Sequence, residues 1–141
     1  MPESGPDIAK ALATVPIFAD LKKRQLSALA KVAKQTVHKA GQDIATQGRA
    51  GLAFHVVIEG SATVRVGDVV RRVLQPGEFF GEISMIDGQP RSASVAAGES
   101  GMTTYAINRS DFLTLVDRDS EFARAIMIAL CGQIRAATSA R

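Results

Sequence analysis

The pattern of apolar and polar positions changes character twice along the chain. Residues 7–34 repeat apolar side chains at helical spacing, and Pro16 disfavours helix at the residue before it. We therefore expect a short helix, an apolar elbow at Val15–Phe18 and a longer second helix. Helical spacing returns at Arg109, and Asp119 or Ser120 is placed to cap a last helix.

Residues 36–107 carry a β pattern instead. Val64 and Val66 alternate with polar neighbours as in a half-buried strand, and the pair Gly67-Asp68 predicts a tight hairpin. The β-rich runs are separated by glycine-containing turns and comprise Phe54–Ile58, Ala62–Val66, Val69–Leu74, Ala93–Ala97 and Thr103–Ile107. Helices, then short evenly spaced strands, then helices indicate an α+β fold built on a closed roll or a sandwich.

Composition narrows the class of protein. The chain has 141 residues, the size of one domain, and its 46% hydrophobic and 22% charged residues are typical of a globular protein. No apolar stretch is long enough for a membrane span, and the first residues lack the pattern of a secretory signal. The net charge of +3 and the basic triplet Lys22–Arg24, expected on a solvated helix face, do not predict nucleic-acid binding. A lone cysteine, Cys131, fits a reducing, cytoplasmic compartment.

The segment Phe79–Val95 carries features that a plain scaffold does not need. Gly81 allows close backbone approach, and a short helix beginning there would present N–H groups to an anion. Arg91 offers a planar fork of donors for two phosphate oxygens, Glu82 can accept from a sugar hydroxyl, and Ser92 adds a hydroxyl and an N–H. These residues predict a site for one phosphate beside one ribose hydroxyl. The alternative is an ion pair between Glu82 and Arg91 that only holds a loop.

This segment resembles the phosphate-binding cassette of cyclic nucleotide-binding domains. The matching positions are Phe80, Gly81, Glu82, Ile83, Met85, Ile86, Pro90, Arg91, Ala93, Ser94 and Val95. Val15–Phe18, Val57–Gly60, Leu74–Gly77 and Asp111-Phe112 resemble the family's apolar elbow, central hairpin, glycine turn and following helix. The resemblance implies one domain over residues 1–141, with helices in 1–35, an antiparallel, jelly-roll-like β-roll of about eight strands in 36–107, the cassette at 79–95, and hinge and lid helices in 108–141.

The resemblance also implies residue roles. Glu82 would accept the ribose 2′-hydroxyl beside the Gly81 backbone, and Arg91 would pair with the exocyclic phosphate oxygens, assisted by Ser92. The purine would lie against Val64 under a lid from the last helix. The expected contact residues are Val64, Phe80, Gly81, Glu82, Ile83, Ser84, Arg91, Ser92 and Ala93, and the lid candidates are Met127, Leu130 and Cys131. The expected ligand is cAMP, with cGMP as the alternative.

Catalysis and metal binding are not expected. His38 and His55 are the only histidines, and a cupin-type metal site needs a close pair, a third histidine and a carboxylate. No cofactor and no catalytic residue is expected, and a metal-dependent β-roll enzyme is the weaker reading. Arg71 and Arg72 are expected on a solvated strand edge.

The expected function is regulatory: ligand binding orders the last helix over the purine and controls an attached channel, enzyme or partner. The layout resembles the sensor of bacterial cyclic nucleotide-gated potassium channels, and equally a free-standing module. A homo-oligomer through the helices is an open alternative. So is the truncated sensor half of a catabolite-activator-type transcription regulator, whose DNA-reading part would follow Arg141. We expect no direct contact with nucleic acid and a cytoplasmic location, either free or as the cytoplasmic domain of a membrane protein.

Overall fold

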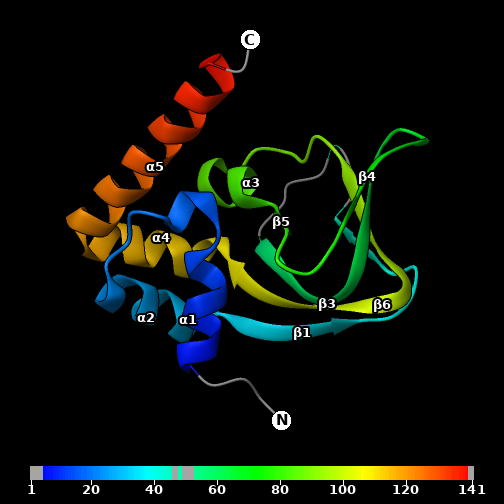
Figure 1. Ribbon diagram of the computed structural model, residues 1–141, viewed down its shortest axis with the longest axis horizontal. Helices are drawn as coiled ribbons and strands as arrows, with labels where there is room; N and C mark the ends of the chain where they lie inside the picture. Colours follow the sequence, from blue (N-terminus) through cyan, green and yellow to red (C-terminus); the bar gives the residue numbers. More distant parts are fainter. Residues whose placement is uncertain (1–4, 46–47, 49–52, 140–141) are drawn as a thin grey trace. The chain divides into compact units, whose positions relative to one another are not determined.

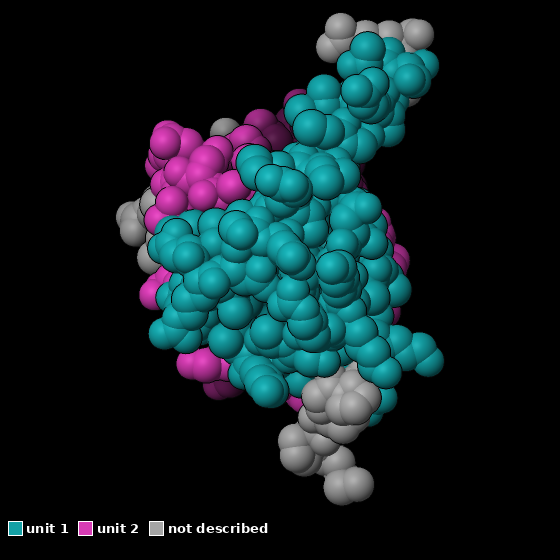
Figure 2. Space-filling view, turned by 90° about the vertical axis from the view of Figure 1, so that its left-hand side faces the viewer, with its two compact units in different colours: residues 1–32, 111–141 teal, residues 33–110 magenta. Residues whose placement is uncertain are grey.

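The computed structural model describes residues 5–45, 48 and 53–139 of the chain (Figure 1). The chain forms two compact units, one of residues 1–32 with 111–141 and one of residues 33–110 (Figure 2). We call them the helical unit and the β unit. The predicted roll of residues 36–107 lies within the β unit, and the architecture is α+β as expected.

The helical unit is built on an apolar elbow. It contains α1 (Gly5–Ala13), the 3-10 helix η1 (Pro16–Phe18), α2 (Lys23–Val32), most of α4 (Arg109–Arg118) and α5 (Ser120–Ser139). Pro16 opens η1, and its other two residues, Ile17 and Phe18, are buried, which confirms the predicted elbow. α5 packs against η1, and the Phe112 and Phe122 rings meet edge to face with centroids 5.9 Å apart. None of the described helices combines the length and apolarity that a membrane span requires.

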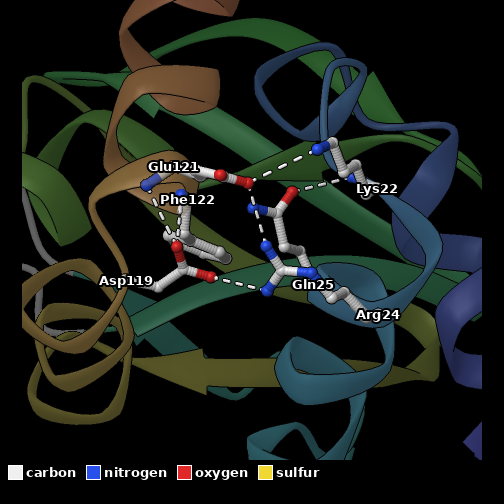
Figure 3. A network of polar contacts seen from close by, with 6 residues as sticks. All are labelled: Lys22, Arg24, Gln25, Asp119, Glu121 and Phe122. Carbon is white, nitrogen blue, oxygen red and sulfur yellow. Dashed lines mark hydrogen bonds and ion pairs between the residues drawn. The ribbon is translucent and has the colours of Figure 1, made fainter.

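A polar network joins the start of α2 to the start of α5 (Figure 3). Arg24 donates from Nη1 to Asp119 Oδ2 at 3.0 Å and from Nη2 to Glu121 Oε2 at 2.9 Å. The other carboxylate oxygen of Asp119 accepts from the backbone N–H groups of Glu121 and Phe122, so Asp119 caps α5, one of the two predicted caps. The Lys22–Arg24 triplet is exposed as expected, but its first and last members, Lys22 and Arg24, form ion pairs rather than standing free in solvent.

The β unit is an antiparallel sheet of six strands among the described residues. The strands are β1 (Lys34–His38), β2 (Asp43–Ala45), β3 (Ala53–Val66), β4 (Val69–Leu74), β5 (Phe79–Phe80) and β6 (Ser94–Asn108). The order is β1-β6-β3-β4, with β2 paired to β6 and β5 paired to β3, and Figure 1 shows β6 running between β1 and β3.

Among the described residues there are six strands where about eight are expected, and two of the six are long. β3 covers both predicted runs on either side of Gly60, and β6 covers both runs on either side of Gly98 and Gly101. The register of β3 against β6 shifts on each side of Gly60, whose φ is +77°. A Cβ at Gly60 would overlap the Gly101 carbonyl, so the two strands bend together there without ending. The bend folds the sheet around a core of Val57, Ala62, Leu74, Phe80, Val95, Ala97 and Met102.

A short helix interrupts the β unit where the sequence predicts one. α3 (Glu82–Asp87) begins after Gly81 at φ +88° and ends at Gly88 at φ +71°, both left-handed positions that suit glycine. Met85 is fully buried and anchors the helix, so Glu82 is held at a fixed place at its first turn.

Candidate functional site

A cavity of about 290 Å³ lies within the β unit, near the lower end of the range for ligand sites. The structure brings all the predicted contact residues to its wall. They are Val64, Phe80, Gly81, Glu82, Ile83, Ser84, Arg91, Ser92 and Ala93. Sequence reasoning missed four further wall residues, which are Arg72, Leu74, Phe79 and Val95. The cavity therefore has a polar end at the cassette and an apolar wall supplied by β3, β4 and β6.

Arg91 is fixed from two sides. Its Nη2 donates to the Ala53 carbonyl oxygen at 2.6 Å, and its Cζ lies 5.9 Å from the centroid of the Phe80 ring. The Nε atom is buried and has no hydrogen-bond partner among the described residues. Burial lowers the pKa of Arg91 and the Glu82 carboxylate raises it, but a guanidinium keeps its proton in proteins. The side chain is thus a preplaced cation with donors still available.

Gly81 is required by this placement. A Cβ at Gly81 would overlap Arg91 Nη1 and would lie 2.5 Å from the Ala53 carbonyl oxygen. Only glycine lets the guanidinium lie directly against the backbone there while the residue holds a positive φ.

Glu82 stands beside this cation at the cavity wall. Burial raises the pKa of the Glu82 carboxyl, while its own backbone N–H and the charges of Arg91 and Arg72 lower it. Glu82 and Arg91 do not form an ion pair in the part of the chain that the structure describes. The ion pair of the loop-holding alternative is therefore absent among the described residues, and the roles of Glu82 and Arg91 toward a ligand stay a prediction.

The remaining predicted residues differ in exposure. Ser84 is buried within α3 and Val64 is partly buried, whereas Ile83 and Ser92 are exposed at the cavity rim. Ser92 is therefore placed to add a hydroxyl from the solvent side. The structure puts each of these residues on the wall, and their contacts with a ligand stay a prediction.

Arg72 is the most informative of the missed residues. It pairs directly with Val64 in the β3–β4 register, so both side chains stand on the same face of the sheet. Its Nη2 donates to Glu78 Oε2 at 2.8 Å. The expectation of a solvated strand edge describes Arg71, whereas Arg72 lines the cavity although its side chain is exposed. Counting register back from the Gly67-Asp68 turn would have placed it near Val64 only with knowledge of the bulge at Val64 and Arg65.

The lid candidates lie in the helical unit. Met127 and Cys131 are exposed on α5 and Leu130 is half-buried. Whether α5 covers the base stays a prediction. In the described residues, no three His, Cys, Asp or Glu side chains gather in a way that could hold a metal ion.

Comparison with known proteins agrees with this site. A sequence model of the cyclic nucleotide-binding domain matches residues 35–119. A cyclic nucleotide-gated potassium channel of Mesorhizobium japonicum is 33% identical over 112 residues, which cover 79% of this chain and 31% of the channel. A cGMP-dependent protein kinase of Caenorhabditis briggsae is 31% identical over 117 residues, covering 77% of this chain and 15% of the kinase. This chain thus spans a third or less of these two relatives.

Solved structures show the same fold. The N-terminal domain of a transcriptional regulator from Streptomyces coelicolor A3(2) superposes with a TM-score of 0.82 at 25% identity, covering 92% of this chain and 96% of that one. The family match covers more than half of the chain and includes the whole cavity wall. The chain belongs to the cyclic nucleotide-binding domain family.

Proposed function

We propose that this chain is the sensing domain for a purine 3′,5′-cyclic mononucleotide, with cAMP as the first candidate. The observation that carries the proposal is the preplaced Arg91 beside Glu82, which forms no ion pair with another described residue, in one cavity. A cyclic mononucleotide presents one anionic phosphate close to one ribose hydroxyl. The cavity offers a guanidinium and a carboxylate acceptor at the same end.

The binding geometry follows from the donors and acceptors that remain. With Nη2 of Arg91 donating to Ala53 and Nε buried, the Nη1 end of the guanidinium pairs with the exocyclic phosphate oxygens. Glu82 accepts the ribose 2′-hydroxyl, and Ser92 assists at the rim. The base lies on the apolar wall of Val64, Leu74 and Val95, where adenine requires no charged partner.

cGMP is a second candidate that one residue favours. Arg72 stands beside Val64 on the wall proposed for the base. A guanidinium donates well to guanine O6 and N7, whereas adenine presents an N6 amino donor at the first of these positions. The similarity to a cGMP-dependent kinase supports this candidate as well.

The proposed output is regulatory rather than catalytic. Ligand binding orders α5 over the base and so shifts an equilibrium between two states of α5, and an attached channel or other effector responds to that shift. The similarity to a potassium channel supports an effector in cis, and the similarity to part of a transcriptional regulator supports the alternative of a sensor half that controls DNA reading elsewhere. We propose a cytoplasmic location for either output. Self-association through the helices is a further proposed feature.

Calorimetric titration with cAMP, cGMP and a cyclic dinucleotide tests the ligand. We expect binding of a cyclic mononucleotide with one-to-one stoichiometry, and no detectable binding of any of the three would overturn the proposal. Arg72→Ala decides the base: selective loss of cGMP affinity supports guanine, and equal affinity changes for both nucleotides support adenine. Hydrogen exchange of α5, measured with and without ligand, tests the lid, because protection that does not rise on binding contradicts it.

A further inference from the structure

The Phe80 ring that lies against Arg91 is itself stacked on a histidine. His55 on β3 pairs with Phe80 on β5 in the strand register, and their ring centroids are 4.9 Å apart at an interplanar angle of 12°. The ring under the guanidinium therefore cannot turn without disturbing His55.

His55 is in turn held by hydrogen bonds. Its Nδ1 lies 2.9 Å from Thr104 Oγ1, and Thr104 is fully buried on β6. Thr104 shares a 2.7 Å hydrogen bond with Thr36 Oγ1, which also lies 3.0 Å from His38 Nε2. The chain of contacts thus begins on β1, crosses β6 and ends under Arg91.

The imidazole of His55 is neutral at physiological pH. Burial, and then the nearby charges of His38 and Arg91, lower the pKa of His55 to about 3. A neutral ring packs beside a guanidinium without like-charge repulsion. The neutral His55 therefore adds no positive charge that would have to be held against Arg91.

One short stretch of β3 contributes two contacts that hold the Arg91 side chain in place. Ala53 supplies the carbonyl that accepts from Arg91 Nη2, and His55, two residues later, supplies the ring that supports Phe80. We propose that His55, held by Thr104, is a positioning residue that fixes the Phe80 ring and thereby the guanidinium of Arg91. The phosphate-binding role of Arg91 in this inference rests on the proposed function.

The first test needs no ligand. The buried Nε–H of Arg91 gives an NMR signal in protein labelled with ¹⁵N-arginine, assigned by its loss in Arg91→Lys. We expect His55→Leu to speed exchange of this proton with water about tenfold, and His55→Phe, which keeps a stackable ring, to leave it close to wild type. Equal exchange in wild type and His55→Leu would overturn the proposal.

The second test uses cAMP and cGMP affinity. We expect His55→Leu to weaken binding about tenfold, Thr104→Val to weaken it about threefold, and His55→Phe to stay within about threefold of wild type. Val56→Ala is the matched control, because Val56 is buried on the same strand but points to the other face. In an Arg91→Ala background His55→Leu should cause no further loss, since both changes act on one contact.

The outcomes separate the two proposals. Additive losses in the double variant, or a loss as large for Val56→Ala, would show a general structural effect and overturn the positioning role. Wild-type protein that binds no cyclic nucleotide, yet shows the expected exchange pattern, would refute the proposed function while supporting His55 as the residue that positions Arg91.

Discussion

The Arg91 side chain donates from Nη2 to the backbone carbonyl oxygen of Ala53 at 2.6 Å, across 38 residues of sequence. Part of the guanidinium is thus committed to the protein before any ligand arrives. This contact fixes where the remaining donors point, and it spares the ligand the entropy of ordering a long side chain.

Arg91→Ala should weaken cyclic nucleotide binding roughly tenfold to a hundredfold or more. A charge-assisted hydrogen bond contributes about 1.5–3 kcal/mol, and Arg91→Lys should recover only part of it because an ammonium lacks the planar fork. Titration calorimetry measures both. Arg71→Ala is the control, because Arg71 is exposed on β4 and does not line the cavity. A similar loss of affinity in Arg71→Ala would mean that the ligand responds only to the net charge of the protein.

Gly81→Ala should lower both stability and affinity. Alanine at a positive φ costs about 1–3 kcal/mol, and the new Cβ would also push against Arg91 and the Ala53 carbonyl. Gly41→Ala separates these effects, because Gly41 has φ +73° with nothing within 4 Å of a Cβ. We expect a loss of unfolding free energy in both variants and a loss of affinity in Gly81→Ala alone, measured by urea unfolding and titration. Unchanged affinity in Gly81→Ala would contradict the tight placement of Arg91.

The sequence predicted the site best where its residues are close along the chain. Gly81, Glu82 and Arg91 belong to one segment, so residue types and spacing were sufficient. Arg72 was not predicted as a wall residue because its position depends on a strand register that a bulge shifts. The contact of Arg91 with Ala53 was not predicted because any residue type can supply a backbone carbonyl. Two runs that the sequence separates at Gly60 form one continuous strand, because Gly60 lies at a bend inside β3, whereas glycine in a sequence is typical of a turn.

Glu82→Gln should stabilise the protein at neutral pH while weakening the ligand. Burial raises the pKa of Glu82, so the folded state favours the protonated carboxyl more than the unfolded state does. The ionised group therefore lowers stability once the pH exceeds the unfolded value, and this cost is absent at lower pH. We expect a Tm roughly 2 °C above wild type at pH 7 that converges with it in acid, and about tenfold weaker binding. Glu59→Gln is the control, because Glu59 is exposed. An equally large rise in Tm for Glu59→Gln would show that burial of the Glu82 carboxylate is not the cause.

His55 should make the folded state sensitive to acid. Its folded pKa of about 3 lies below the unfolded value of 6.5, so below pH 6.5 the unfolded chain binds a proton that the native protein does not. Its contribution is therefore constant above pH 6.5, and stability falls as the pH drops towards 3, by at most about 1.4 kcal/mol per pH unit. Urea unfolding of wild type and His55→Phe across this range measures the slope. Parallel curves for the two proteins would show that His55 does not carry it.

Asp119 offers a test of the helical unit, because it both caps α5 and pairs with Arg24. Asp119→Ala removes both contacts, whereas Asp119→Asn keeps an oxygen for the cap and loses only the charge. We expect the alanine variant to lower Tm by roughly 3 °C and the asparagine variant by less.

Salt and acid distinguish the two contributions of Asp119. The Tm difference between wild type and Asp119→Asn should shrink at high salt, because exposed ion pairs are screened. The Tm difference between Asp119→Asn and Asp119→Ala should persist. The Phe122 N–H, and then the Arg24 side chain and the Glu121 N–H, lower the pKa of Asp119 below 3.8. The advantage over asparagine is therefore present above pH 3.8 and is lost as the pH falls through the folded value. If the Tm difference between wild type and Asp119→Asn changes with neither salt nor pH, the cap accounts for the whole effect of Asp119 and Arg24 for none of it.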